Sequence, residues 1–222
     1  MDITILEGVD GTGKTTFAQE LCDKVTQSII KRPFPRNYKR LNRKEAINNY
    51  YKMREIGLDD ERDFVKLYNH LSGDKDILEI GNGFIMDRSF ISGIVYSINA
   101  HLITYDFSFL QLFRPTKNSD KWYDYLSEIN NAIENITDKL LQDYLDISGH
   151  IYKQHNIKLY YMRKIYDKTK SDNIEKNNKQ EMLSYIYAIV IRRILETYTY
   201  KNIKLIEVYG KKKCKDINVI FN

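Results

Sequence analysis

Residues 8–16 read Gly8-Val9-Asp10-Gly11-Thr12-Gly13-Lys14-Thr15-Thr16, a complete match to the glycine-rich phosphate-binding loop pattern. The short apolar run Ile3-Thr4-Ile5-Leu6 comes just before it, as expected of a buried parallel strand. After it, apolar residues recur at three- and four-residue spacing, which indicates one buried face of a helix: Phe17, Ala18, Leu21, Cys22 and Val25. Strand, loop and helix therefore follow one another in the order that the motif requires.

The motif also predicts a chemistry. Glycines let the loop turn its amide N–H groups inward, and the N-terminus of the next helix adds the positive end of its dipole. Lys14 can then reach the β- and γ-phosphates of a triphosphate, and the Thr15 hydroxyl can bind Mg²⁺. We therefore expect ATP and Mg²⁺ as cofactors. The residues expected to contact ATP are Gly8, Asp10, Gly11, Thr12, Gly13, Lys14, Thr15 and Thr16.

Composition narrows the class of protein. The chain has 222 residues, 42% hydrophobic and 29% charged, which is typical of a soluble globular protein. No apolar run approaches the ~20 residues of a membrane span, and the first strand follows Met1 directly, which leaves no room for a signal peptide. We expect a cytoplasmic protein with no membrane partner, in which Cys22 is a buried free thiol.

Positive charge is spread along the chain. The net charge of +5 favours anionic ligands. The run Lys211-Lys212-Lys213-Cys214-Lys215 has no interleaved aromatic residues of the kind that stack on nucleic-acid bases. We expect no nucleic-acid partner, and we divide the chain into one domain over residues 1–210 and a basic C-terminal extension over residues 211–222.

Apolar strands alternate with helices throughout the chain. Further strands are expected over residues 28–32, 84–86, 157–162 and 203–208. Helices are expected over residues 45–53, 64–71, 126–145 and 182–194, the second ending at Ser72-Gly73 and the third at Ser148-Gly149. This alternation predicts an α/β protein with a three-layer P-loop NTPase fold, in which helices flank a mainly parallel five-stranded sheet.

Asp87 and Arg88 follow the third strand directly. Ligands of open parallel sheets sit beyond the carboxyl ends of the strands, so this pair is expected beside the phosphate-binding loop. The alternative for a bare Asp-Arg pair is a local salt bridge.

The hydrophilic segment over residues 163–180 lies between the fourth strand and the last helix. Such segments in kinases form mobile lids that exclude water and bring cations to the transferring phosphoryl group. Arg163, Lys168 and Lys170 are the cations available in a lid of this kind, the two lysines as further ATP contacts. The alternative is a solvated loop with no role in chemistry.

Together these stretches resemble the thymidylate kinase family of nucleoside monophosphate kinases. Leu6-Glu7-Gly8-Val9-Asp10-Gly11-Thr12-Gly13-Lys14-Thr15-Thr16 is similar to the phosphate loop of the family. Asp87-Arg88-Ser89-Phe90-Ile91-Ser92-Gly93-Ile94-Val95-Tyr96-Ser97 is similar to its Asp-Arg-Tyr-x-x-Ser-Gly-x-Ala-Phe-Thr signature. Phe34-Pro35-Arg36 resembles the Phe-Pro-x-Arg element, and Ser171-Asp172-Asn173-Ile174-Glu175 aligns loosely with the end of the lid. The resemblance runs in order over residues 3–208.

The resemblance implies roles for the residues that match. Arg88 would bridge the donor and acceptor phosphates, and Asp87 would orient Arg88 or a metal-bound water. The catalytic set is Lys14, Asp87, Arg88 and Arg163, and the metal set is Thr15 and Asp87. The substrate-binding set is Asp10 at the acceptor sugar, Arg36 at its phosphate, Phe64 against its base, and Arg88, Ser92 and Tyr96.

Some positions depart from the family pattern. Asn173 stands where the family has a lid arginine, and Gly11 stands where one branch carries a catalytic arginine. A catalytic cation must then come from Arg163 or from a lid lysine.

The acceptor side departs as well. The Phe-Pro-Arg element is one residue short, so either Arg36 shifts or Lys39 or Arg40 takes its place. No Asn-Arg or Asp-Arg pair lies on the expected helix around Phe64, where the family reads thymine, so the base stays open.

The leading hypothesis is ATP-dependent phosphorylation of a deoxynucleoside 5′-monophosphate, first of all dTMP to dTDP. A deoxynucleoside kinase is the alternative; Ser89 resembles its Glu-Arg-Ser element, but that chemistry needs a carboxylate beside the acceptor hydroxyl. A P-loop ATPase acting on nucleic acid and a nucleotide-binding protein without catalysis are further alternatives. The partners expected are small nucleotide substrates and a second copy of the chain, for which the apolar stripe over residues 126–145 is either the interface or part of the core.

Overall fold

The computed structural model describes residues 2–25, 28–32, 43–73, 83–103, 119–163, 174–197 and 203–209. Five strands form one parallel sheet in the order β2-β3-β1-β4-β5. Their bounds are β1 Asp2–Glu7, β2 Ser28–Lys31, β3 Phe84–Asp87, β4 Asn156–Arg163 and β5 Ile203–Tyr209. The predicted three-layer α/β fold with a five-stranded parallel sheet is therefore confirmed.

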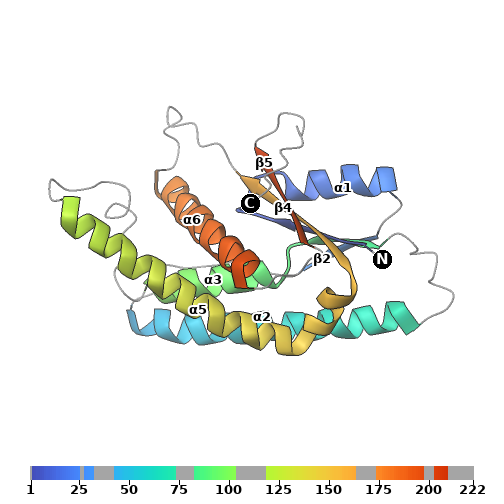
Figure 1. Ribbon diagram of the computed structural model, residues 1–222, viewed down its shortest axis with the longest axis horizontal. Coiled ribbons are helices and arrows are strands. Elements are labelled where there is room, and N and C mark those ends of the chain that lie inside the picture. Colours follow the sequence, from blue (N-terminus) through green and yellow to red (C-terminus); the bar gives the residue numbers. More distant parts are fainter. Residues whose placement is uncertain are drawn as a thin grey trace.

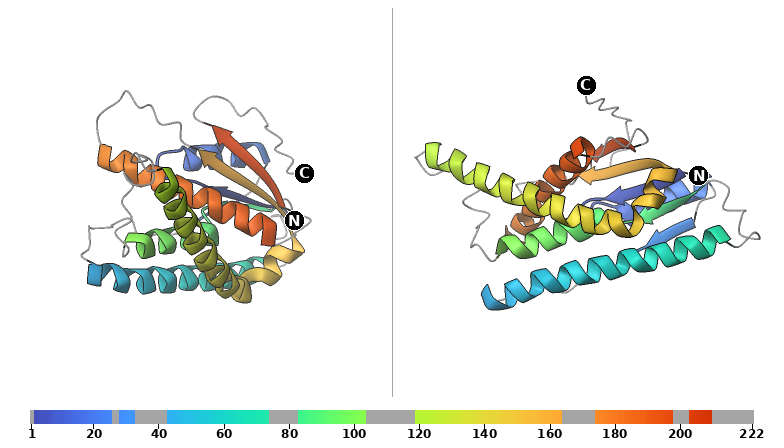
Figure 2. Two further views of the ribbon diagram at one scale, coloured as in Figure 1. Left: turned by 60° about the vertical axis from the view of Figure 1, so that its left-hand side comes forward. Right: turned by 60° about the horizontal axis from the view of Figure 1, so that its bottom comes forward.

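Helices cover both faces of the sheet (Figures 1 and 2). Helix α1 (Lys14–Val25) packs on one face, and α2 (Arg43–Gly73), α3 (Phe90–Ile103), α5 (Ser119–Gln154) and α6 (Ile174–Thr197) gather on the other. Within β1, Ile3 and Ile5 belong to the large core under the second group, whereas Leu6 packs with Ala18 of α1. Both faces of the central strands β1 and β3 are buried, which explains why these strands read as nearly continuous apolar runs; β4 and β5 carry the exposed residues Lys158 and Lys204.

The phosphate-binding loop follows β1, the strand from which the sheet is extended in both directions, by β3 and β2 on one side and by β4 and β5 on the other. The chain leaves β1 for β2 on one side, and β1 pairs with β4 on its other side. The register puts Leu6 beside Asp87 and Glu7 beside Tyr161. A crevice at the carboxyl ends of β1, β3 and β4 is the usual ligand position in such sheets.

Three expected helix boundaries are wrong. The helices expected over residues 45–53 and 64–71 are one helix, α2; α5 continues through Ser148-Gly149 to Gln154; and α6 begins at Ile174, inside the expected lid. The reason is common to all three. Apolar periodicity marks only the buried part of a helix, whereas Lys, Glu and Gln also favour helix on an exposed surface.

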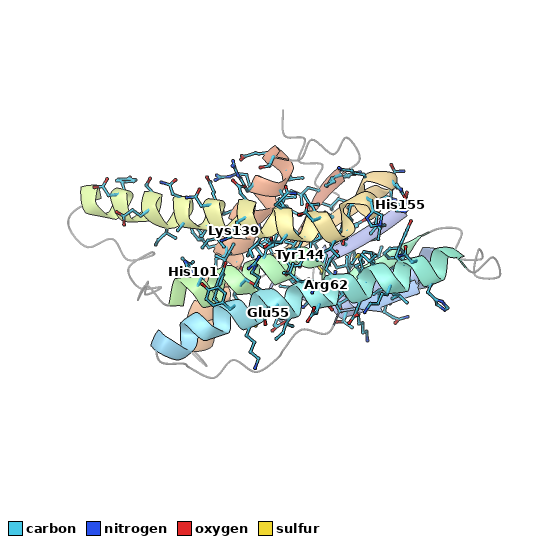
Figure 3. The ribbon with its side chains drawn as sticks, turned by 90° about the horizontal axis from the view of Figure 1, so that it is seen from below. Glu55, Arg62, His101, Lys139, Tyr144 and His155 are labelled. Atoms are coloured by element: carbon cyan, nitrogen blue, oxygen red, sulfur yellow. The ribbon has the colours of Figure 1, made fainter. Side chains whose placement is uncertain are left out.

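Close packing explains why a glycine, Gly57, stands in the middle of α2. A side chain at Gly57 or at Gly93 of α3 would collide with the hydroxyl of Tyr144. Tyr144 comes from α5 and is fully buried between the helices, as Figure 3 shows. The stripe over residues 126–145 is accordingly core, with these members buried: Ile129, Ile133, Leu140, Leu141 and Tyr144.

Other expectations meet the structure only in part. Cys22 is half-buried rather than buried, and among the described residues it forms no disulfide. Within the described ranges, no helix has both the length and the hydropathy needed to span a membrane. Cys214, Lys168, Lys170, Arg36 and the extension over residues 211–222 lie outside the described residues.

Candidate functional site

The phosphate-binding loop joins the end of β1 to the start of α1. Gly8 has a φ of 137°, and a side chain there would collide with the carbonyl oxygen of Met162 in β4. Only glycine therefore fits this crossing of the two segments. The Thr12 hydroxyl donates to Val9 O at 2.9 Å, which closes the loop ahead of the helix. The strand, loop and helix predicted from the motif are thus present in that order.

Lys14 lies inside this loop and is 6% exposed. Its Nζ donates to Gly8 O at 2.9 Å and to Val9 O at 2.8 Å. Burial, followed by the charge of Arg88, lowers the pKa of Lys14 to about 8. An anion placed in the loop would offer this ammonium group a charged partner in place of two carbonyls.

Two oxygens meet beside the first turn of α1. The Thr15 hydroxyl donates to Asp87 Oδ2 at 2.8 Å, and Asp87 ends the neighbouring strand β3. A hydroxyl next to a carboxylate is the pair that holds Mg²⁺ in P-loop proteins, where phosphates and waters complete the coordination. The structure therefore brings together the two residues predicted to bind the metal. Among the described residues, no group of three His, Cys, Asp or Glu side chains offers a second place for a metal ion.

Arg88 follows Asp87 and turns its guanidinium toward the loop. Its Nη2 forms an ion pair with Asp10, and its Nη1 lies 3.5 Å from Gly8 O. The side chain of Arg88 is only 12% exposed, whereas that of Asp10 is 76% exposed. The ring of Tyr96 lies 5.7 Å from its Cζ, in the range of a cation–π contact. Arg88 thus contacts the loop, as the sequence predicts.

The backbone of Arg88 is strained. Its φ is 79°, and no other described non-glycine residue has a positive φ. Non-glycine residues rarely adopt this conformation, which costs of order 1–3 kcal/mol unless neighbours hold it. One such contact is the Arg88 N–H, which donates to Leu6 O at 3.1 Å. Strain next to a ligand site is a common property of functional loops.

Sequence reasoning assigned no role to Glu7. This residue ends β1 and is 0% exposed, yet it carries a carboxylate. Its Oε1 accepts from Ser89 N and Ser89 Oγ, both at 2.7 Å, and its Oε2 accepts from Ser92 Oγ at 2.6 Å. The signal was available: Glu7 follows the run Ile3-Thr4-Ile5-Leu6 at the end of a central strand, where burial is expected and a buried carboxylate needs hydrogen-bond partners.

Two polar residues of α6 were also missed. Tyr187 is fully buried, and its hydroxyl lies 2.8 Å from Ser92 Oγ and 3.3 Å from Arg88 Nη1. Gln180 donates from Nε2 to Asp10 O at 3.3 Å. Gln180 is the last residue of the segment expected as a lid, and Tyr187 lies in the helix expected over residues 182–194, for which the sequence predicts no site residue. Helix α6 is therefore part of the site, although its apolar pattern reads only as core.

Three further residues predicted for the site are engaged within the protein itself. Ser92 is fully buried, donates to Glu7 and accepts from Arg88, so its hydroxyl is not open to a substrate. Phe64 is 3% exposed and stacks on Tyr152 in the core, so a base could reach its ring only by displacing core residues. Arg163 is held by Glu207 at 3.0 Å.

A second arginine network lies at the end of β2. Arg32 is 7% exposed and bridges two carboxylates of α2, Asp60 and Glu61. The Tyr152 hydroxyl donates to Glu61 Oε1 at 3.1 Å, and the Arg32 Cζ lies 5.6 Å from the Phe64 ring. The bonding face of Arg32 is therefore turned to α2 and not to the loop.

Comparison of the sequence with family models and with curated proteins gives no match. Among solved structures, the chain is similar to a deoxyadenosine kinase from M. mycoides with bound dATP, with 16% identity over 93% of this chain and 91% of that chain, and a TM-score of 0.46. It is also similar to a thymidylate kinase from Candida albicans, with 20% identity over 95% of this chain and 84% of that chain, and a TM-score of 0.44.

Both neighbours are named as kinases, one of a deoxynucleoside and one of thymidylate. At these identities and TM-scores the likeness concerns the fold, and the activity of this chain has to be inferred from its own residues.

Proposed function

We propose that this protein is a phosphotransferase that moves the γ-phosphoryl group of ATP to a deoxynucleoside 5′-monophosphate, with dTMP as the first substrate to test. The observation that carries the proposal is the position of Arg88. Its guanidinium lies against the phosphate-binding loop at Gly8 O and pairs with the exposed Asp10. A cation held between the donor loop and the open side of the site can stabilise charge on a phosphoryl group in transfer.

The donor half of the reaction follows from the loop. Its amide groups and Lys14 would hold the β- and γ-phosphates. Thr15 and Asp87, with their oxygens 2.8 Å apart, fit a Mg²⁺ ion that also binds phosphate oxygens. When bound, this ion would supply positive charge to the β- and γ-phosphates of ATP. Lys14 and Arg88 supply the positive charge that comes from the chain itself.

The acceptor half favours a phosphate over a hydroxyl. In the proposed step an anionic oxygen of the monophosphate forms a bond to the γ-phosphorus, the bond to the β–γ bridging oxygen breaks, and ADP leaves with that electron pair. No proton has to be removed from the acceptor. Asp10 would contact the acceptor sugar, the role that the family resemblance implies.

The carboxylates near the loop support the same choice. Transfer to a nucleoside 5′-hydroxyl needs a carboxylate as general base. Among the described residues at this edge, each carboxylate already has a partner: Glu7 with two serines, Asp10 with Arg88, Asp87 with Thr15, and Asp60 and Glu61 with Arg32. Asp10, with a side chain 76% exposed, is the most easily released of these carboxylates, and a deoxynucleoside kinase that used it as a base would give up its ion pair with Arg88.

A coupled ADP-release assay tests the proposal. ATP and Mg²⁺ are supplied with a panel of nucleosides and their 5′-monophosphates, and Lys14→Ala serves as the control. Turnover on dTMP or another deoxynucleoside monophosphate that is lost in the control would support the proposal and identify the base. Turnover on nucleosides alone would overturn it in favour of a deoxynucleoside kinase. Hydrolysis that needs DNA or RNA would point to a P-loop ATPase, and ATP binding without turnover to a protein without catalysis.

Three finer proposals accompany this one. The protein would act in the cytoplasm, where its nucleotide substrates are, and as a homodimer. Residues 1–210 would form the catalytic domain, so a chain lacking residues 211–222 should keep its turnover rate. Sedimentation equilibrium tests the dimer, and the truncated chain in the same ADP-release assay tests the domain boundary.

A further inference from the structure

The buried carboxylate of Glu7 has a place in the site that the proposed mechanism does not use. It lies under Arg88, enclosed by the end of β1 and the start of α3, and it is 0% exposed. We infer that Glu7 is the positioning residue that fixes the guanidinium of Arg88, acting through the hydroxyls of Ser92 and Tyr187. The inference rests on the proposed function insofar as it concerns turnover.

The chemistry of the groups fixes the direction of each hydrogen bond. Glu7 as a carboxylate can only accept, so the single proton of the Ser92 hydroxyl goes to Glu7 Oε2 at 2.6 Å. The two lone pairs of Ser92 Oγ then face two donors, the Tyr187 hydroxyl at 2.8 Å and Arg88 Nη1 at 3.3 Å. Every hydrogen-bonding capacity of Ser92 is used. The single proton and the two lone pairs of Ser92 Oγ therefore allow only one arrangement of its hydrogen bonds.

The pKa of the Tyr187 hydroxyl agrees with this direction. Burial, followed by the negative charge of Glu7, raises the pKa of Tyr187 well above its ordinary value. The phenol therefore stays protonated and donates to Ser92, while its oxygen accepts from Arg88 Nη1 at 3.3 Å. Two neutral oxygens, themselves oriented by a buried charge, thus hold one edge of the guanidinium.

Glu7 also holds the strained turn from which Arg88 projects. Its Oε1 binds the N–H and the hydroxyl of Ser89, the next residue in the chain. The Arg88 N–H is bound to Leu6 O and the Ser89 N–H to Glu7. The peptide groups on both sides of the Arg88 Cα, where φ is 79°, are therefore held in place. One carboxylate therefore controls the backbone of Arg88 through Ser89 and its side chain through Ser92.

Helix α6 is part of the same network. Tyr187 comes from α6, and Gln180 of this helix donates to the backbone of Asp10, the ion-pair partner of Arg88. The orientation of Arg88 therefore depends on the position of α6 as well as on the sheet. This gives a reason for a polar hydroxyl at a fully buried position of an otherwise apolar helix face.

Glu7→Gln is the decisive substitution because it keeps the shape and changes the donors. The Ser89 N–H cannot reverse, so the amide oxygen has to take the place of Oε1 and the amide N–H₂ has to face Ser92. Ser92 Oγ then accepts from this amide, so the Ser92 proton has to turn to the Tyr187 oxygen, and the Tyr187 proton loses its acceptor in the network. We expect kcat to fall about 10- to 100-fold, the scale of a misplaced catalytic group. The KM for ATP should change little because Lys14 and the loop amides are untouched.

Tyr187→Phe in the Glu7→Gln background tests whether the two residues act through one network. Because Glu7 orients the Tyr187 hydroxyl through Ser92, the second substitution should lower kcat by a smaller factor in Glu7→Gln than in the wild type. Tyr152→Phe is the control, because it also removes a fully buried tyrosine hydroxyl, one that donates to Glu61. The control should lower stability and leave kcat close to that of its parent in both backgrounds. Wild-type kcat in Glu7→Gln, or factors for Glu7→Gln and Tyr187→Phe that simply multiply, would overturn the inference.

Two further measurements keep the inference testable. If Glu7→Gln does not fold, Ser92→Ala breaks the same link without removing the charge, and we expect kcat to fall about 10-fold at an unchanged KM for ATP. If the wild-type protein turns over no acceptor, the proposed function fails, and the guanidinium ¹⁵N signals of Arg88 decide. Rotation of the Arg88 guanidinium should be hindered in the wild type and free in Glu7→Gln. Identical guanidinium signals in the two proteins would overturn the inference.

Discussion

Arg88 and Arg32 occupy similar positions but differ in their partners. Each follows a strand end, β3 for Arg88 and β2 for Arg32; these strands are neighbours, and the Arg32 N–H donates to Asp87 O at 3.3 Å. Each side chain is mostly buried, with an aromatic ring about 5.6 to 5.7 Å from its Cζ. The partners of Arg32 are two enclosed carboxylates of α2, with side chains 10% and 0% exposed. The charged partner of the Arg88 guanidinium, Asp10, is 76% exposed.

Under the proposed function, this difference separates an arginine that holds the fold together from an arginine that binds phosphate. The guanidinium of Arg32 is neutralised by two enclosed carboxylates, which a ligand from solvent cannot reach or readily replace. The guanidinium of Arg88 is held at one edge by neutral oxygens and at the other by a carboxylate that water can reach, so a phosphate can replace that carboxylate at little cost. An arginine that binds a substrate needs one exchangeable partner, and Arg88 has it.

Arg88→Ala should give the largest effect on turnover. Arginines that stabilise a transferring phosphoryl group contribute about 10³- to 10⁵-fold to kcat, and we expect a loss in this range. The unfolding free energy should fall less than in Arg32→Met, because the buried Glu7 keeps its hydrogen bonds to Ser89 and Ser92 and the lost ion-pair partner, Asp10, is exposed. Steady-state kinetics and denaturant unfolding of the same preparation check both statements. A loss of less than tenfold would remove Arg88 from the catalytic set.

Arg32→Met should give the reverse result. It leaves Asp60 and Glu61 buried without a counter-charge, which costs about 3–5 kcal/mol of unfolding free energy. The kcat of the protein that remains folded should stay within a few-fold of the wild type. Urea unfolding monitored by circular dichroism gives the first quantity, and turnover normalised to folded protein gives the second. A large loss of kcat with unchanged stability would show that the comparison of the two arginines is wrong.

Lys14 predicts a moderate pH effect on nucleotide binding. With a pKa of about 8 in the free protein, Lys14 is mostly neutral at pH 9, and a bound triphosphate would return it to the charged form. ATP binding should therefore take up about one proton at pH 9 and be about tenfold weaker than at pH 7. Calorimetry in two buffers of different ionisation enthalpy measures the proton. No uptake at pH 9 would contradict the burial of this ammonium group.

The same group affects stability with a defined sign. The pKa of Lys14 is lowered from 10.5 in the unfolded chain to about 8 in the fold, so the unfolded chain binds more protons between these values. The contribution of Lys14 to the unfolding free energy therefore rises with pH across this window. Lys14→Met should remove that rise, which pH-dependent urea unfolding of the two proteins can show.

The sequence predicted local features well and partner choice poorly. The loop at Gly8 and the Asp87-Arg88 pair could be found because backbone geometry and strand ends leave signals in adjacent residues. Nothing adjacent marks Tyr187, which reaches Arg88 across 99 residues of chain, or shows that Ser92 faces inward to Glu7.

Phe64 is a residue that the sequence assigned to the site and the structure places in the core. Its helical spacing is equally compatible with core and with a base-binding site, and only the packing of α2 against Tyr152 of α5 decides for the core. Residue type and period specify which side chains are buried; they do not specify which side chains meet.

Asp10→Asn gives the smallest expected stability effect and tests exchangeability directly. The carboxylate of Asp10 is mostly solvated, so its loss should change the unfolding free energy by less than about 1 kcal/mol. Asp60→Asn, at the 10% exposed partner of Arg32, is the matched change at a buried site and should cost more. Equal costs at the two sites would mean that Arg88 depends on Asp10 as Arg32 depends on Asp60. Arg88 would then have no partner that an acceptor phosphate could displace, and the distinction between the two arginines would fail.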